Sequence, residues 1–372
     1  MARFIVTGGG TSGHINPAIT IADSLTQYYK EKGQPCEIVF TGRSNGLEGD
    51  LVPKAGYKFH SIEAMPFPMK PSIRLIKAIL ALRRGRKACA KLINEFNPDA
   101  VIGTGGYVCA PLLLEAKKRK VKVMLHESNA FPGRANKLLG KKADLVMVGF
   151  ESVKDVFSSA RRIVVTGNPI RSTMLNVDYV TSRKNLGLAD GEKLIFAMGG
   201  SLGSKTINDF ILQIARDERF SDVKFVLAMG KQQSSSVDIS NVPANVEIKE
   251  YIYNPQDYLC AADICITRAG AVTCAEIAAV GSCSILVPYP YAAHDHQTFN
   301  ARAFVDVDGA KLVADSDVAK GALTKVLLEL INDDKKRSEM RQNARKLAVY
   351  DTNDRIINAI VDTLEGKAGD SK

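Results

Sequence analysis

The stretch Arg3-Phe4-Ile5-Val6-Thr7-Gly8-Gly9-Gly10-Thr11-Ser12-Gly13-His14 decides the fold of this 372-residue chain. An apolar strand leads directly into a glycine-rich turn, and residues 18–32 after the turn have the apolar spacing of a helix. The same order recurs at 193–198, where the apolar run is followed by Gly199-Gly200-Ser201-Leu202-Gly203-Ser204. A strand, a glycine-rich turn and a helix in each half predict parallel sheets with helices on both faces.

Short apolar runs alternate with amphipathic stretches along the whole chain. The first set of runs lies at 3–7, 37–41, 100–103, 122–126 and 145–148. We expect the second set to begin at 162–167 and to continue at 193–198, 224–228, 263–267 and 284–288. This pattern predicts an α/β fold with two doubly wound parallel-sheet domains. Because Gly167-Asn168-Pro169 marks a boundary, we expect domains at 1–166 and 167–350, and a helix within 351–372 that packs back on the first domain.

Positive charge is concentrated in the first part of the chain. The formal net charge is +10, and residues 1–150 hold 23 basic and 11 acidic side chains, against 27 and 29 in the remainder. Such an excess predicts an anionic partner for the first domain: nucleic acid, an anionic membrane surface or a phosphorylated substrate.

Residues 64–94 hold eight basic side chains and no acidic one. The face that we expect to contact a membrane comprises Ile73, Ile76, Ile79, Leu80, Arg83 and Arg84. A basic helix with an apolar tip is typical of contact with a membrane surface. A core helix with a solvated basic face would have the same sequence pattern. Phe67 is the one aromatic residue of the segment, whereas single-stranded nucleic acid is bound by basic residues with interleaved aromatic ones. We therefore expect no nucleic-acid partner.

Composition excludes several other classes of protein. The chain is 45% hydrophobic, which is enough for packed cores. No apolar run reaches the ~18 residues of a membrane-spanning helix, and Met1-Ala2-Arg3 leads into a strand instead of a signal peptide. Seven cysteines without a CxxC pair indicate neither a disulfide framework nor a zinc site. We expect a cytoplasmic protein.

Polar and glycine residues at strand ends are the candidates for chemistry. Glycine lets the backbone approach a ligand, and a helix N-terminus attracts anions, so either glycine-rich turn, or the third one at 103–107, can bind phosphate or simply pack strand against helix. His14 closes the first turn and suits a general base, although helix capping is the alternative. His126 and Glu127 end another strand and face the same choice between ligand contact and structural hydrogen bonding.

The second half offers a carboxylate and several weak metal motifs. Glu276 lies in the helix after strand 263–267, where a carboxylate can accept two hydrogen bonds from a ribose, or simply be a solvated helix residue. Asp295 between His294 and His296, and the Asp pairs at 306–308 and 315–317, have poor metal spacing. We expect no metal and no cofactor.

Seven motifs occur in one order: Gly9-Gly10-Thr11-Ser12-Gly13-His14, Gly103-Thr104-Gly105-Gly106-Tyr107-Val108, His126-Glu127-Ser128-Asn129, Gly167-Asn168-Pro169-Ile170-Arg171, Gly199-Gly200-Ser201-Leu202-Gly203, Arg268 to Glu276, and Gln297 with Asn300-Ala301. In this order the chain resembles the MurG family of glycosyltransferase family 28. The resemblance implies the GT-B fold, in which two Rossmann-like domains face each other across a cleft.

The resemblance also implies a reaction and a place for it. The family transfers GlcNAc from UDP-GlcNAc, held mainly by the C-terminal domain, to the 4-hydroxyl of MurNAc in lipid I, which binds the N-terminal domain. The anomeric configuration inverts, and the product is lipid II for peptidoglycan, which serves cell shape and division. The implied location is peripheral, on the anionic cytoplasmic face of a bacterial cell membrane.

Residue roles follow from the same resemblance. His14 maps onto the proposed base, and Glu127 is a second candidate on chemical grounds. Gly105, Gly106 and Tyr107 map onto the acceptor diphosphate site. The positions that bind the donor are Thr11, Ser12, Gly13, Asn129, Arg171, Ser201, Ile252, Ala271, Val272, Thr273, Cys274, Ala275, Glu276 and Gln297. Ser12, Ser128 and the loop 292–296 depart from the family's usual residues. Other activities that fit the sequence are a diacylglycerol glycosyltransferase, a UDP-GlcNAc epimerase and a non-enzymatic adaptor that binds a nucleotide sugar at a membrane.

Overall fold

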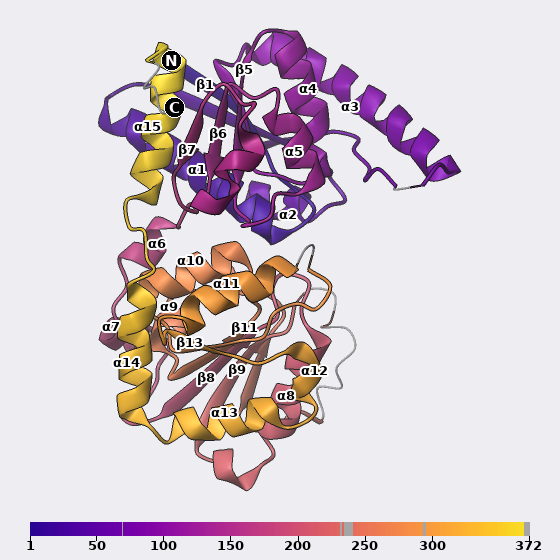
Figure 1. Ribbon diagram of the computed structural model, residues 1–372. Coiled ribbons are helices and arrows are strands. Elements are labelled where there is room, and N and C mark those ends of the chain that lie inside the picture. The colour runs from indigo at the N-terminus through magenta and orange to yellow at the C-terminus, as the bar shows by residue number, and fades with distance from the viewer. Residues whose placement is uncertain (69, 231–232, 234–240, 293–294, 368–372) are drawn as a thin grey trace. The chain divides into compact units, whose positions relative to one another are not determined.

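A computed structural model describes residues 1–68, 70–230, 233, 241–292 and 295–367. The chain divides into two compact units (Figure 1). The first unit is formed by Met1–Pro169 together with the segment that starts at Asp351, and the second by Ile170–Tyr350.

The first unit contains a parallel sheet with the order β3-β2-β1-β4-β5-β6-β7. Its strands are β1 (Ala2–Thr7), β2 (Cys36–Gly42), β3 (Lys58–Ser61), β4 (Ala100–Gly103), β5 (Lys122–Glu127), β6 (Leu145–Val148) and β7 (Ile163–Val165). Its helices are α1 (Ser12–Glu31), α2 (Glu48–Lys54), α3 (Ile73–Phe96), η1 (Tyr107–Cys109), α4 (Ala110–Lys118), α5 (Arg134–Gly140), η2 (Glu151–Phe157) and α15 (Thr352–Glu365). Helices α1 and α15 contact each other, and α3, α4 and α5 share the core cluster of Ile5, Leu92 and Leu112.

The second unit repeats this arrangement with the order β10-β9-β8-β11-β12-β13. Its strands are β8 (Lys193–Met198), β9 (Val223–Ala228), β10 (Val246–Lys249), β11 (Ile264–Thr267), β12 (Ser284–Leu286) and β13 (Ala310–Leu312). The helices are α6 (Ser172–Leu175), α7 (Tyr179–Asn185), α8 (Lys205–Ile214), η3 (Glu218–Phe220), α9 (Gln256–Ala261), α10 (Ala271–Val280), α11 (His296–Val305), α12 (Asp315–Val318), α13 (Ala322–Ile331) and α14 (Asp334–Arg345). Neighbouring Leu194 and Ile195 belong to different core clusters, so both faces of the sheet are buried.

Two sequence-based expectations about the strands were wrong. The run 162–167 does not open the second set, because β7 pairs with β6 at the edge of the first sheet. The sheets are also wider than about five strands, since the described residues include β3, β10 and β13, which the sequence did not reveal. These are short edge strands, and β3 reads Lys58-Phe59-His60-Ser61, without the continuous apolar run of a buried strand.

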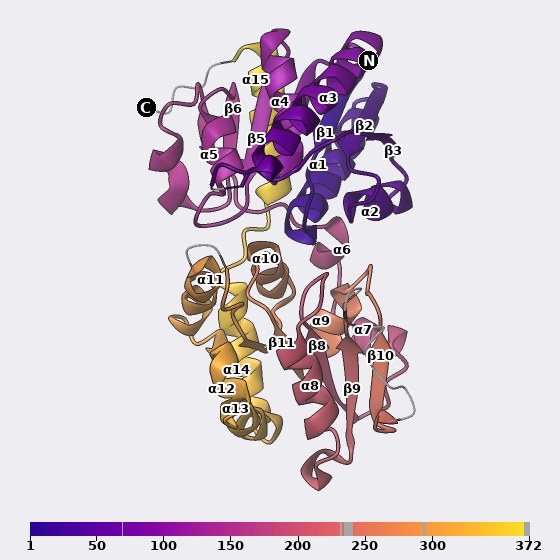
Figure 2. The same cartoon turned by 90° about the vertical axis from the view of Figure 1, so that its right-hand side faces the viewer.

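Helix α3 lies beside α4 (Figure 2), and the apolar side chains at its N-terminal end are exposed to solvent. The exposed fraction is 74% for Ile73 and 61% for Ile76, and Ile79 and Leu80 are also exposed. The helix packs instead through a separate row that includes Ala78, Ala81 and Cys89. The exposed isoleucines therefore lie outside the core, although the rest of α3 packs on it. Among the described residues, no helix is both long and apolar enough to cross a membrane.

The C-terminal helix α15 is fastened to the first unit by polar contacts as well as apolar ones. Arg162 donates to Thr363 Oγ1 at 3.2 Å and pairs with Asp362 at 3.2 Å. Lys122 donates to the Thr363 carbonyl at 3.0 Å. Ile356 and Ile360 are buried on the same helix. The last described helix thus belongs to the unit that begins at Met1, and its Asp362 contacts Arg162 across 200 residues of sequence.

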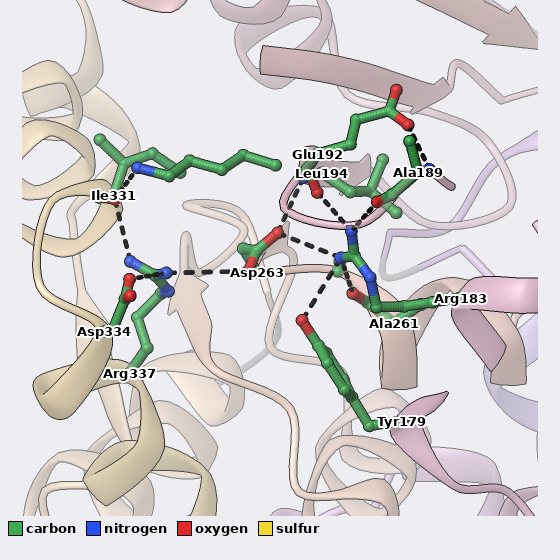
Figure 3. A network of polar contacts seen from close by, with 12 residues as sticks. Tyr179, Arg183, Ala189, Glu192, Leu194, Ala261, Asp263, Ile331, Asp334 and Arg337 are labelled. Carbon is green, nitrogen blue, oxygen red and sulfur yellow. Dashed lines mark hydrogen bonds and ion pairs between the residues drawn. The ribbon is translucent and has the colours of Figure 1, made fainter. Parts of the chain in front are cut away.

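A buried carboxylate joins several elements of the second unit (Figure 3). Asp263, just before β11, accepts a hydrogen bond from the Leu194 amide at 2.8 Å and faces Arg183 and Arg337 at 3.6 and 3.7 Å. Arg183 also donates to the carbonyls of Ala189 and Glu192, and Arg337 to those of Leu330 and Ile331. The Asp263 carboxylate therefore faces two arginines, and each of these donates hydrogen bonds to backbone carbonyls of neighbouring segments.

We expect Asp263→Asn to lower the free energy of unfolding by about 3 kcal/mol, because it removes the carboxylate that Arg183 and Arg337 share and leaves Arg337 paired with Asp334 alone. Urea denaturation measures the change. Asp317→Asn is the matched control, since the Asp317 side chain is half-exposed and pairs with the exposed Lys320 at 2.8 Å. Equal stability of the two variants would contradict the role given to Asp263.

Candidate active site

The parallel pairing of β1 with β4 brings two glycine-rich turns together in the first unit. Thr7 is the register partner of Gly103 at the carboxyl ends of these strands. Beyond them, the Gly9 amide donates to the Gly105 carbonyl at 3.3 Å. Thr104 Oγ1 donates to the His14 carbonyl at 2.6 Å. The turns 8–14 and 103–107, which the sequence identified separately, thus form one site.

Glycine is required where these turns touch. A Cβ on Gly8 would lie 2.1 Å from Thr104 Oγ1, and one on Gly106 would lie 2.3 Å from the Gly9 carbonyl oxygen. Gly105 and Gly106 have φ of +119° and +85°, which L side chains rarely adopt. A Cβ on Gly105 would also approach His14 Cδ2 to 2.6 Å. The imidazole of His14 therefore lies directly over the second turn.

The hydrogen bonds of His14 define its tautomer. Nδ1 lies 3.1 Å from the Gly9 carbonyl oxygen, and Thr11 Oγ1 lies 3.4 Å from the same nitrogen. A carbonyl oxygen only accepts, so Nδ1 carries the proton in this arrangement. The neutral ring then holds its lone pair on Nε2, which is the form that a general base needs.

Glu127 is a buried anchor of the loop after β5. Its Oε1 accepts hydrogen bonds from the backbone amide and the side-chain amide of Asn129, at 2.9 and 3.0 Å. Its Oε2 accepts from Asn136 Nδ2 at 2.7 Å and from the Gly133 amide at 3.3 Å. Protonating this carboxylate would weaken four hydrogen bonds. The geometry therefore favours His14 over Glu127 as the base and makes Asn129 a residue whose position Glu127 sets.

His126 has a structural environment. It is buried, its Nε2 donates to the Gly167 carbonyl at 3.1 Å, and Ser128 Oγ lies 3.3 Å from its Nδ1. Burial lowers the pKa of His126 from 6.5 to about 4. The ring is therefore neutral at pH 7. Its hydrogen bond to Gly167 connects β5 to the end of the Met1–Pro169 segment.

The other predicted residues of the first unit surround His14 at helix and strand ends. Thr11 immediately precedes α1, and Ser12 and Gly13 are its first two residues. Tyr107 begins η1, directly after the second turn, and burial raises its pKa. A helix N-terminus carries partial positive charge, so the start of α1 suits an anionic ligand.

In the second unit, the turn after β8 and the start of α10 meet because β8 pairs with β11. Arg268 Nη2 donates to Ser204 Oγ at 2.7 Å, and its Nη1 donates to the Pro288 carbonyl at 3.0 Å and pairs with Asp315 at 2.5 Å. Ser204 in turn caps α8 by accepting from the Ile207 amide at 3.3 Å. Arg268 thus fixes three loops at the carboxyl edge of this sheet.

The predicted donor-binding residues Arg171 and Glu276 form an ion pair, with Nη2 and Oε1 3.0 Å apart. Burial raises the pKa of Glu276, and the Arg171 guanidinium lowers it. Arg171 also donates to the Tyr253 carbonyl at 2.7 Å, which brings the loop containing Ile252 toward α10. Three separated parts of the sequence therefore meet at one place.

The remaining predicted residues of this unit occupy the same edge. Ser201 is buried in the turn after β8, and Gln297 Oε1 accepts from the Tyr289 amide at 2.9 Å. Residues 271–276 form the first turns of α10, with Ala271, Cys274 and Glu276 buried and Val272, Thr273 and Ala275 half-buried. The structure therefore gathers the predicted residues in two groups, one in each unit.

The weak metal motifs consist of residues that are engaged elsewhere. Asp315 pairs with Arg268, and Asp317 pairs with Lys320. Asp295 accepts from Thr298 Oγ1 at 2.6 Å, while His294 lies outside the described residues. Within the described part of the chain, no group of three or more His, Cys, Asp or Glu residues could hold a metal ion.

Sequence reasoning assigned no role to three residues that shape these sites: Glu48, Asn136, and Arg268, which was named only as the first residue of a motif. Glu48 is fully buried beside the first turn and accepts from the Gly10 amide at 3.2 Å. A signal for it was present, because Gly42, Gly46 and Gly49 surround an acidic residue just after a strand. Arg268 also had a signal, since a charged residue directly follows the apolar run 263–267. Asn136 had none, because its role depends on the fold of the loop after β5.

Comparisons with known proteins agree with this architecture. The N-terminal domain of glycosyltransferase family 28 matches residues 4–148, and the C-terminal domain of that family matches 194–356. A relative from Acetivibrio thermocellus is 37% identical over 371 residues, covering 98% of this chain and 99% of its own. It is named UDP-N-acetylglucosamine--N-acetylmuramyl-(pentapeptide) pyrophosphoryl-undecaprenol N-acetylglucosamine transferase. A relative from Halothermothrix orenii with the same name is 36% identical over 375 residues, covering 98% and 100% of the two chains.

Solved structures show the same fold. Acinetobacter baumannii MurG superposes with a TM-score of 0.69 at 24% identity, covering 97% of this chain and all of that one. UDP-GlcNAc 2-epimerase from Neisseria meningitidis, solved with UDP-GlcNAc, has a TM-score of 0.69 at 16% identity, with 97% and 100% coverage. Two parallel-sheet units with glycine-rich turns at their strand ends define the GT-B fold, and the matches to both family domains define a glycosyltransferase. The chain belongs to glycosyltransferase family 28.

We expect His126→Gln to reduce the loss of stability on acidification. The folded-state pKa of His126 lies at about 4, below its ordinary 6.5, so its contribution is fully present above pH 6.5 and is lost as the pH falls from 6.5 to 4. The loss is at most about 3 kcal/mol. Glutamine can still donate to Gly167 but does not titrate. Urea denaturation of both proteins at several pH values measures the difference, and parallel curves between pH 6.5 and 4 would contradict the buried neutral ring.

Proposed function

We propose that this protein transfers GlcNAc from UDP-GlcNAc to the 4-hydroxyl of MurNAc in lipid I, with inversion at the anomeric carbon, to form lipid II. The observation that carries the proposal is the full-length similarity to relatives named for this transfer. The His14 geometry supports it, because an inverting transfer needs one base beside the acceptor hydroxyl. The product would serve peptidoglycan synthesis, and through it cell shape and division.

The chemistry is a single displacement. The acceptor 4-hydroxyl gives its proton to His14 Nε2 while its oxygen forms a bond to the anomeric carbon of GlcNAc. The bond from that carbon to the diphosphate oxygen breaks, and UDP leaves with the electron pair. The tautomer set by Gly9 presents the required lone pair. Protonated His14 returns its proton to solvent or to the departing diphosphate.

Donor recognition is assigned to the second unit. Backbone amides of the turn at Ser201 and the N-termini of α8 and α10 can stabilise the charge that develops on the leaving diphosphate. Glu276 would accept hydrogen bonds from the ribose hydroxyls, with Arg171 keeping the carboxylate charged. Residues 271–275, Ile252 and Gln297 would line this ligand. Thr11, Ser12, Gly13 and Asn129 would contribute from the first unit.

Acceptor recognition is assigned to the first unit. The glycine turn at Gly105, Gly106 and Tyr107 lies against His14, so an acceptor diphosphate bound there would hold the sugar close to the base. The apolar tip of α3 would rest on the cytoplasmic membrane leaflet, from which the lipid substrate reaches the site. Its isoleucines are exposed, and the neighbouring Arg83 is exposed too, which suits an anionic surface.

We expect UDP release and lipid II formation when the protein is given UDP-GlcNAc and a lipid I analogue. A free sugar formed without acceptor would indicate an epimerase, and transfer to diacylglycerol would indicate another lipid acceptor. Binding of UDP-GlcNAc without UDP release would indicate an adaptor. Each of these three results contradicts the proposal.

In the same assay we expect His14→Ala to lower turnover by about 10²–10⁴-fold, the range for a lost acid–base group. The Kd for UDP-GlcNAc should stay within about twofold, because the donor is assigned mainly to the other unit. A near-normal kcat would remove His14 from the role of base.

We expect the double variant Ile76→Ser/Ile79→Ser, combined with neutral replacements of Arg83 and Arg84, to weaken binding to anionic vesicles by at least about tenfold. Turnover of a water-soluble acceptor analogue should survive, since these side chains lie outside the core. Val180→Ser, which removes an apolar side chain of the second unit that is 76% exposed, is the control. Equal loss of vesicle binding and turnover would contradict a membrane role for α3.

A further inference from the structure

One peptide group of the first turn lies between two side chains. The carbonyl of Gly9 accepts the Nδ1 hydrogen bond of His14 at 3.1 Å. The amide of Gly10, which belongs to the same peptide group, donates to Glu48 Oε2 at 3.2 Å. The two hydrogen bonds form a continuous chain from the Glu48 carboxylate to the imidazole.

The Glu48 carboxylate has a space built for it. Its side chain is fully buried at the start of α2. A Cβ on Gly9, Gly42 or Gly46 would come within 2.9, 2.6 and 2.6 Å of its side-chain atoms. Its Oε1 accepts from the Arg43 amide at 3.2 Å and faces Arg43 Nε at 3.5 Å. Burying a carboxylate is costly even when it is hydrogen-bonded. Three glycines leave room for the Glu48 carboxylate beside the first turn, which indicates that this carboxylate has a role in the site.

We propose that Glu48 is a positioning residue for His14 and acts through the Gly9–Gly10 peptide. The negative charge polarises this peptide and makes the Gly9 carbonyl a stronger acceptor, because hydrogen bonds in a chain reinforce one another. The stronger acceptor holds the proton on Nδ1 and leaves the lone pair on Nε2. The importance of this arrangement for catalysis rests on the proposed function, in which His14 is the base.

Other charged groups also lie near the His14 imidazole and influence its protonation. Arg43 neutralises part of the Glu48 charge, and its guanidinium lies 5.3 Å from the centre of the Tyr107 ring, next to the second turn. On the other side, Asn136 lies close to Gly105, since a Cβ added to Gly105 would be 3.1 Å from Asn136 Nδ2. The same nitrogen donates to Glu127 Oε2 at 2.7 Å. Glu48 is the carboxylate that reaches His14 through a peptide hydrogen-bonded at both ends.

The test is Glu48→Gln, which keeps the shape and an acceptor oxygen but removes the charge. Nitrogen NMR of histidine-labelled full-length protein reports the tautomer and the titration of His14, assigned by comparison with His14→Gln. We expect a smaller Nδ1–H fraction and a titration midpoint at lower pH. In the transfer assay, kcat should fall by about 10–100-fold while the KM for UDP-GlcNAc stays within about twofold, and the acidic limb of the pH profile should move with the NMR titration.

Glu115→Gln is the matched control. Glu115 is also a buried carboxylate of this unit with arginine partners, Arg86 and Arg119, at 3.0 and 3.1 Å. It should leave the His14 spectrum and the pH profile unchanged. A fall in kcat for Glu48→Gln with an unaltered His14 tautomer and titration would overturn the proposal, because it would mean that Glu48 only supports the fold.

The NMR arm separates this proposal from the proposed function. If Glu48→Gln shifts the His14 spectrum while His14→Gln keeps full transfer activity, the positioning by Glu48 stands and His14 is not the base. If Glu48→Gln does not fold, Arg43→Gln replaces it, since removing the half-buried guanidinium leaves the carboxylate less neutralised. The His14 titration should then move to higher pH, and no movement or the opposite movement would overturn the proposal.

Discussion

The parallel pairing of β1 with β4 is the constraint on which the first site depends. These strands are far apart in sequence, yet their register places Thr7 beside Gly103, so the turns that follow them must share one small space. Glycine at positions 8, 105 and 106, together with the hydroxyl of Thr104, lets both backbones fit there. The orientation of His14 is a consequence of that packing, because its ring lies on one turn and hydrogen-bonds to the other.

The second unit uses the same strand order for a different purpose. Its glycine-rich turn follows β8, and Arg268 follows the neighbouring strand β11. Arg268 connects the loops at this edge by binding Ser204 and Asp315. The first unit therefore holds the hydrogen-bonded imidazole of His14 at its strand ends, whereas the second holds backbone amides and the Arg171–Glu276 ion pair. A shared architecture thus supports two distinct chemical environments.

Much of this was predictable from sequence because it depends on local order. Apolar runs followed by glycines predicted the central strands, both turns and His14, and the helix at 351–365 was found at Thr352–Glu365. Partners set by distant pairing were not predictable. Glu48 contacts the first turn from a helix some 35 residues later, and His126 looked as suitable for chemistry as His14 until its burial was known. Edge strands such as β3 escaped because pairing on one side does not require an apolar sequence.

The return of α15 to the first unit has a consequence for the order in which the protein acquires its structure during synthesis. A ribosome must translate the whole of Ile170–Tyr350 before it reaches the helix that buries Ile356 and Ile360 against the first sheet. The second unit, formed from one uninterrupted stretch, can fold while the first still exposes the apolar surface that awaits α15. The chain order therefore allows the later unit to be complete while the earlier one still awaits its last helix, the reverse of the usual vectorial order.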